Sequence, residues 1–198
     1  KYSKSKYAVA VSNCTAALHL SLMALGIGKD DEVIIPDLTF VADANAVLAC
    51  NAKPVVADIN KENFFLSLSN IKKNITKRTK AIIPVHIYGQ VCNIDEILDL
   101  AKDHNLKVVE DCAHAVGTFH KSKHVGTLGN TGCFSFYPTK NITTAEGGMV
   151  TTNSKEIAEK VRQLRSHGMT KSLKSRYSSE YPWVFDIIEP GYNLSLIH

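Results

Sequence analysis

The chain has 198 residues, and its 23 lysines and arginines exceed its 19 aspartates and glutamates by a formal net charge of +4. Apolar residues make up 44% and charged residues 21%, proportions typical of a soluble globular domain, which excludes a disordered, collagenous or fibrous chain. The basic residues are not interleaved with aromatic side chains, and no apolar run approaches the ~20 residues of a membrane span. We therefore expect no nucleic-acid partner and no membrane association.

Five cysteines are present: Cys14, Cys50, Cys92, Cys112 and Cys133. Their odd number and the lack of any CxxC spacing argue against a disulfide framework and against a zinc ribbon, so we expect a reducing, cytoplasmic location. The chain begins without Met and stops in an apolar run with no cap, and it has no internal repeat or linker. We expect one domain over residues 1–198, truncated at both ends.

Short apolar, β-branched runs alternate with segments of helical period along the whole chain. In chain order, strands are expected at 7–11, 32–35, 54–59, 81–85, 107–111, 133–136 and 148–152. Helices are expected between them at 15–25, 41–50, 68–75 and 94–104, and after the last strand at 157–164. Because the strands are nearly continuous in apolar residues, the sequence predicts a mainly parallel sheet covered on both faces, a three-layer α/β/α fold. Ligands of such sheets bind beyond the carboxyl ends of the strands.

The segment after the first strand, Ser12 to Ala16, is small and polar and opens a helix. The free amides and the dipole of a helix N-terminus favour an anion, so this segment is a candidate phosphate cradle. An ordinary N-cap by Ser12 or Asn13 is the alternative, because neither a GxGxxG nor a GxxxxGK[ST] loop is present.

Two carboxylates end the strand at 107–111, and Cys112 and His114 follow them. This group has three interpretations: catalysis, a metal site that includes Cys112, or a satisfied network in the core. A metal needs three or four ligands, and no further cluster in the sequence completes the set.

Lys140 lies in a loop five residues after Ser135. A lysine excluded from solvent can lose its proton and act as an amine nucleophile in Schiff-base chemistry. Pyridoxal phosphate requires such a lysine, a phosphate cradle and a carboxylate for its pyridine nitrogen. Lys140, the Ser12 to Ala16 segment and Asp111 supply these parts, and Phe40 offers an aromatic ring to cover the cofactor.

With these residues in place, the sequence resembles the DegT/StrS-type sugar-nucleotide aminotransferases, a family of fold type I pyridoxal-phosphate enzymes. The matching stretches follow the family's order and cover nearly the whole chain: SNCTAALHLSLMALGI, GKDDEVIIPDLTFVADANAVL, PVVADI, IIPVHIYGQ, VVEDCAHAVG, GCFSFYPTKNITTAEGGMV, RSHG and EPGYN. The chain departs from the family in two places. Cys14 stands where Gly is common, and Leu194 and Ser195 replace the usual Arg-Met.

The resemblance implies a role for each matching residue. The catalytic residues would be Lys140, which forms an imine with the cofactor, and Asp111, which contacts the pyridinium nitrogen. The other cofactor contacts would be ring stacking by Phe40, phosphate contacts from Thr15, Ala16 and Ser135, and His114 beside the phenolic oxygen. Asn193 would reach the phosphate of a neighbouring subunit, which implies a homodimer with a shared active site. The chain would be the large cofactor-binding domain without the family's smaller C-terminal domain.

The function that the resemblance implies is transfer of an amino group from an amino acid, glutamate, to a keto group of a nucleotide-linked sugar, as in surface polysaccharide synthesis. Three alternatives stay open. One is a non-catalytic regulator or scaffold that keeps the fold. Another is a sugar dehydratase, a sibling in which His replaces the lysine, so that Lys140 argues against it. The last is a thiol enzyme that uses Cys14 or Cys112 with His114.

Overall fold

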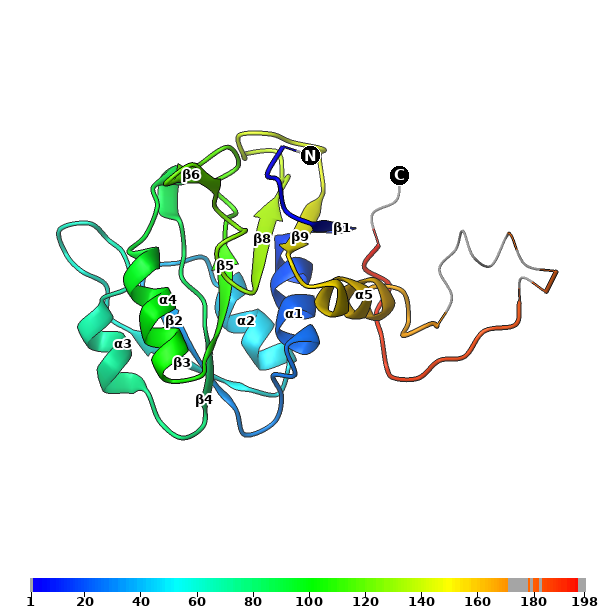
Figure 1. Ribbon diagram of the computed structural model, residues 1–198, viewed down its shortest axis with the longest axis horizontal. Helices are drawn as coiled ribbons and strands as arrows, with labels where there is room; N and C mark the ends of the chain where they lie inside the picture. The colour runs from blue at the N-terminus through cyan, green and yellow to red at the C-terminus, as the bar shows by residue number, and fades with distance from the viewer. Residues whose placement is uncertain (1, 171–177, 179, 182, 196–198) are drawn as a thin grey trace.

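The computed structural model describes residues 2–170, 178, 180–181 and 183–195 (Figure 1). Its main sheet has seven strands: β1 (Tyr7–Val11), β2 (Glu32–Pro36), β3 (Lys53–Ala57), β4 (Thr79–Ile82), β5 (Lys107–Asp111), β8 (Thr131–Ser135) and β9 (Gly148–Thr152). They lie in the order β1-β9-β8-β5-β4-β2-β3. The pairs from β3 across to β8 are parallel, and only β9 runs against its two neighbours. The prediction of a mainly parallel sheet is confirmed.

Five α-helices connect or follow these strands: α1 (Cys14–Ala24), α2 (Ala42–Ala49), α3 (Leu68–Asn74), α4 (Ile94–Asp103) and α5 (Lys155–Leu164). Each agrees with a predicted helix to within a few residues at its ends. A 3-10 turn, η1 (Ile87–Gly89), follows β4. Over the described ranges, no helix is both long enough and apolar enough to cross a bilayer.

The strands are apolar along their whole length because helices cover both faces of the sheet. On β2, Val33 and Ile35 pack into the cluster that includes α1, α2 and α5, whereas Ile34 between them packs with α3 and α4. Val109 and Val108 on β5 divide in the same way. Figure 1 shows the resulting layers, with α3 and α4 on one side of the sheet and α1, α2 and α5 on the other. The three-layer prediction is therefore confirmed.

Two predicted strands end two or three residues early. The strand expected at 54–59 stops at Ala57, and Ile59 instead forms a single antiparallel bridge with Leu66. The strand expected at 81–85 stops at Ile82, because Pro84 has no N–H to continue a regular ladder. Val85 still forms one parallel bridge with Asp111, which holds the segment after β4 against the end of β5.

A small antiparallel hairpin, formed by β6 (Phe119–His120) and β7 (Lys123–His124), was not predicted from the sequence. Two residues per strand are too few to show an alternating pattern.

The direction of the main strands determines where the site lies. Since β9 is antiparallel to both β8 and β1, β1 runs parallel to β8, and the carboxyl ends of β1, β2, β4, β5 and β8 meet at one edge of the sheet.

Candidate active site

A pocket of about 600 Å³ opens at this edge of the sheet, within the volume range of small-ligand sites. Its lining comes from the start of α1, the segment between β2 and α2, η1, and the residues that follow β5 and β8. Six of the predicted site residues line it: Thr15, Phe40, Asp111, His114, Ser135 and Lys140. The fold thus brings together side chains that lie far apart in the sequence. Ala16 and Asn193 are not part of this lining.

Asp111 ends β5 and is only 5% exposed, although it lines the pocket. Its Oδ1 accepts a hydrogen bond from the Ala113 backbone N–H at 2.8 Å. Burial raises the pKa of Asp111, while the Ala113 amide and the nearby His114 and Lys140 act to lower it. Burial outweighs these lowering effects, so the pKa of Asp111 lies above its ordinary value.

Lys140 is half-buried in the loop after β8, where its backbone N–H donates to the Tyr137 carbonyl at 2.9 Å. Its side chain takes no part in the ion pairs found among the described residues. The positive charge of Lys140 lowers the pKa of Asp111 and of His114, which places the amine among the polar groups of the pocket. An amine held there without a carboxylate partner is available for covalent chemistry.

His114 stacks on Tyr88, with the two ring centroids 5.6 Å apart and the planes 10° from parallel. Its Nδ1 accepts from the Tyr88 backbone N–H at 3.3 Å, so Nε2 carries the proton of the neutral ring. Burial, and then the charge of Lys140, lower the pKa of His114. Tyr88 is 81% exposed and holds a left-handed φ of 53°, which is uncommon for a residue other than Gly. Such backbone strain is often found at functional sites.

The start of α1 combines a cap with the candidate phosphate cradle. Asn13 is the N-cap, as one alternative predicted, and its Oδ1 accepts from the Ala16 N–H at 2.8 Å. The amides of Cys14 and Thr15 come earlier in the first turn and have no acceptor within the helix. Nearby, the Ser12 hydroxyl is buried and has no hydrogen-bond partner among the described residues. Together with Thr15 and Ser135, these donors suit an oxyanion.

Gly148 fixes how closely β9 approaches this cradle. A Cβ at position 148 would lie 2.3 Å from the carbonyl carbon of Asn13, far inside van der Waals contact. Only Gly permits this approach, because any side chain would push the N-cap residue out of place.

Asn193 is exposed and lies outside the pocket of its own chain. It forms an isolated antiparallel bridge with Ser166. The next residue, Leu194, donates its N–H to the Arg165 carbonyl at 2.9 Å and accepts from the Ser12 N–H at 2.8 Å. Asn193 is thus held near the start of α1, and its expected contact with a neighbouring subunit stays a prediction.

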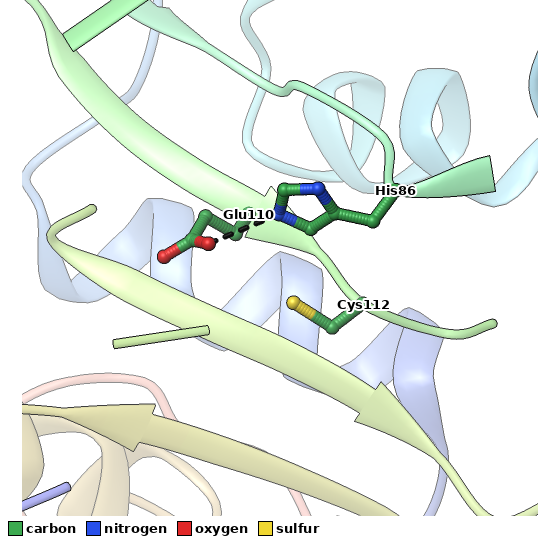
Figure 2. A group of neighbouring side chains, drawn as sticks. All are labelled: His86, Glu110 and Cys112. Carbon is green, nitrogen blue, oxygen red and sulfur yellow. Dashed lines mark hydrogen bonds and ion pairs between the residues drawn. The ribbon is translucent and has the colours of Figure 1, made fainter. Parts of the chain in front are cut away.

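Glu110 precedes Asp111 on β5 and is fully buried, but it serves a different network (Figure 2). Its carboxylate accepts from His86 Nε2 at 3.0 Å and from three backbone amides: Gly126 at 2.8 Å, Leu128 at 2.8 Å and Gly129 at 2.7 Å. His86 Nδ1 accepts from the Cys92 N–H at 3.3 Å. The alternative of a satisfied core network therefore describes Glu110, which the sequence analysis did not pair with His86.

Among the described residues, His86, Glu110 and Cys112 form a group whose potential metal ligands lie within 4.8 Å of one another. Both nitrogens of His86 and both oxygens of Glu110 already take part in hydrogen bonds. A metal held by His86 Nε2 and Glu110 Oε2 would have to break the hydrogen bond between them and compete with the Gly126 N–H for Oε2. The arrangement suits structural support of the loop at 126–129 rather than metal binding.

The thiol-enzyme alternative requires a stabilised thiolate, and the structure disfavours one at both candidate positions. Burial raises the pKa of Cys112 well above its ordinary value, and the carboxylates of Glu110 and Asp111 raise it further. Cys14 lines the pocket, but burial and then Asp111 raise its pKa in the same way. All five cysteines are buried free thiols. Raised thiol pKa values therefore disfavour a cysteine as the nucleophile of the pocket.

Sequence comparison supplies the family. Residues 1–197 match the model of the DegT/DnrJ/EryC1/StrS aminotransferase family. The chain is 47% identical over 97% of its length to the spore coat polysaccharide biosynthesis protein SpsC of Bacillus subtilis, and 51% identical over 85% of its length to the GDP-perosamine synthase of Caulobacter vibrioides. It covers 49% and 45% of these two proteins, so it spans about half the length of the curated relatives it matches. The chain belongs to the DegT/DnrJ/EryC1/StrS aminotransferase family.

Solved structures agree with this assignment. An aminotransferase from Psychrobacter cryohalolentis superposes with a TM-score of 0.91 at 37% identity, over 98% of this chain and 50% of that one. NtdA from Bacillus subtilis, solved with its cofactor PMP bound, gives a TM-score of 0.85 at 32% identity, over 98% of this chain and 42% of that one. The fold is therefore that of the type I pyridoxal-phosphate enzymes, as the resemblance implied.

Proposed function

We propose that the whole protein uses pyridoxal phosphate to transfer an amino group from glutamate to a keto group of a nucleotide-linked sugar. The observation that carries this proposal is the meeting of Lys140, Asp111 and the start of α1 in one pocket. The relatives SpsC and GDP-perosamine synthase, named for polysaccharide and sugar biosynthesis, support the choice of a sugar as acceptor.

The residues of the pocket fit the cofactor part by part. The first-turn amides of α1 and the hydroxyls of Thr15 and Ser135 are donors for the phosphate. Asp111 is a buried acceptor for the pyridine nitrogen, and its anionic form keeps that nitrogen protonated. The Phe40 side chain is 75% exposed at the pocket wall, where it is available to stack on the cofactor ring. When bound, pyridoxal phosphate supplies an electron sink for the carbon that loses its proton.

Two side chains of this chain handle protons and attachment. Nζ of Lys140 would hold the cofactor covalently and, when free, would accept and return the proton of the reacting carbon as a general base and acid. His114 presents its Nε2–H as a donor beside the ring, with Nδ1 held by the Tyr88 amide. The stacked Tyr88 fixes the orientation of the imidazole.

We also propose that the protein works as a homodimer with a shared site. Large apolar side chains at the pocket are exposed in the single chain: Leu38, Phe40, Tyr88 and Tyr137. Asn193 is exposed and outside its own pocket, which leaves it available to a second subunit.

The test of the reaction is to incubate the whole protein with glutamate and a panel of nucleotide-linked keto sugars. We expect 2-oxoglutarate and an amino sugar in equal amounts, and neither product from Lys140→Ala. No product with any sugar, from a protein that binds the cofactor, would instead favour a non-catalytic role.

The test of the shared site is subunit complementation. Lys140→Ala and Asn193→Ala should each have low activity, and a mixture of the two, unfolded and refolded together, should regain part of it. Mixing that restores nothing, although the variants form mixed dimers, would contradict a contribution of Asn193 across the interface.

A further inference from the structure

Asp43 lies in the first turn of α2 and is fully buried. It does not line the pocket, whereas its neighbour Asp111 does. Its Oδ2 accepts from the Thr39 Oγ1–H at 2.6 Å. Its Oδ1 is buried and receives no hydrogen bond from any donor group among the described residues. A buried, ionised carboxylate oxygen that receives no hydrogen bond is energetically unfavourable, so we expect the Asp43 carboxyl group to be protonated.

The carboxyl group of Asp43 is in hydrogen-bonding contact with that of Asp111. Two buried carboxylates in contact do not both ionise readily, because like charges repel strongly where water is excluded. Such a pair titrates as one unit and shares a proton. The surroundings of the two groups decide which of them holds it.

The groups that face the pair favour the anion at Asp111. Asp111 receives the Ala113 N–H, and this hydrogen bond and the positive charge of Lys140 lower its pKa against the effect of burial. Asp43 receives only the Thr39 hydroxyl, and Asp111 is the charged group that acts on it. The remaining titratable neighbours are the buried thiols of Cys14 and Cys133, whose pKa values the two carboxylates raise.

We propose that Asp43 is a positioning residue: it carries the shared proton on Oδ1 and donates it to Asp111, which keeps Asp111 an oriented anion at the pocket wall. The part of this inference that concerns the cofactor rests on the proposed function, in which Asp111 binds the pyridine nitrogen. The part that concerns the proton does not.

A proton held by Asp43 makes the stability of the folded protein depend on pH. Burial, together with the contact to Asp111, raises the pKa of Asp43 well above its ordinary value. Above about pH 4 the folded protein therefore keeps a proton that the unfolded chain has lost. Stability consequently falls as the pH rises from that value towards the raised pKa.

Three variants of the whole protein test the proton: Asp43→Asn, Asp43→Ala and, as a control, Asp95→Asn. The Asn variant keeps an N–H donor for Asp111 and an acceptor for Thr39 but cannot titrate. Asp95 is an exposed carboxylate paired with His120 and Lys121 and lies outside the pocket. Urea midpoints of the cofactor-free proteins are measured between about pH 5 and pH 8, above the ordinary pKa.

We expect the midpoint of the wild type and of Asp95→Asn to fall with rising pH more steeply than that of Asp43→Asn. Equal slopes for wild type and Asp43→Asn would overturn the proposal, because Asp43 would then carry no extra proton. If Asp43→Ala does not fold, the comparison of wild type with Asp43→Asn still tests whether Asp43 carries the proton.

The second readout is the affinity for pyridoxal phosphate, measured by titration of the cofactor-free proteins. Loss of a hydrogen bond to a charged group corresponds to roughly 10- to 100-fold. We therefore expect Asp43→Ala to bind about tenfold or more weakly than the wild type, and Asp43→Asn to stay close to the wild type. Equal losses in both variants, or none in Asp43→Ala, would overturn the positioning role. A wild type that binds no pyridoxal phosphate would refute the proposed function instead, and the pH slopes would still locate the proton.

Discussion

Replacement of Glu110 by Gln should destabilise the fold far more than the small chemical change suggests. Glu110 accepts four hydrogen bonds: two buried ones from His86 Nε2 and the Gly126 amide, and two partly buried ones from the amides of Leu128 and Gly129. In the Gln side chain, one oxygen can still accept from Leu128 and Gly129. The new NH₂ group, however, replaces the oxygen that accepts from His86 and Gly126. Because NH₂ is itself a donor, neither His86 Nε2–H nor the Gly126 N–H keeps an acceptor.

The cost follows from the two donors that lose their acceptor. A buried polar group without a partner costs about 1–3 kcal/mol, so the variant should lose roughly 2–6 kcal/mol. His86 cannot compensate by exchanging its ring proton, because its Nδ1 already accepts from the Cys92 N–H. At a urea slope of ~2 kcal/mol/M, the loss lowers the midpoint of unfolding by about 1–3 M.

Urea unfolding of Glu110→Gln, followed by circular dichroism beside the wild type, measures this effect. The control is Glu96→Gln, an exposed position on α4, where surface substitutions change stability by ~0.5 kcal/mol or less. If Glu110→Gln shifted the midpoint no more than Glu96→Gln does, the reasoning about this network would be refuted.

Two further substitutions and one reaction test other parts of the account. Gly148→Ala should weaken binding of pyridoxal phosphate, because the added Cβ displaces Asn13, and Gly28→Ala, which meets no atom within 4 Å, should not; equal affinities would contradict the cradle. Alkylation of Cys14 by iodoacetamide at pH 8 should be slow in the folded protein, because burial raises the pKa of this thiol well above its ordinary value. Rapid loss of activity at one equivalent of reagent would revive the thiol mechanism.

The sequence predicts the layers of this fold because covering both faces of the sheet leaves a local pattern. The run at Val33, Ile34 and Ile35 is apolar at every position, since its alternate side chains enter different cores. Strand ends are less predictable from the pattern. Pro84 sits inside an apolar run and interrupts the ladder, and Val85 keeps only one bridge to Asp111.

Some residues of the site could also be predicted from the sequence, and others could not. Lys140, Asp111 and the start of α1 could be proposed because each follows a strand and each suits one part of the same cofactor. Asp43 and the pairing of His86 with Glu110 could not, because each carboxylate meets a partner contributed by another strand or loop. A single Asp in the small-residue helix at 42–49 was the available signal, and its meaning depends on the contact with Asp111.

The proposed reaction depends on attachment of the cofactor to Lys140 within this pocket. The most direct test adds pyridoxal phosphate to the whole protein, reduces the complex with borohydride and locates the modified peptide by mass spectrometry. Lys140→Ala is the test variant, and Lys155→Ala, an exposed lysine paired with Glu159 on α5, is the control. We expect a visible absorbance band and a label at Lys140 in the wild type and in Lys155→Ala, and neither in Lys140→Ala. An equal band in Lys140→Ala, or a label on another lysine, would contradict it.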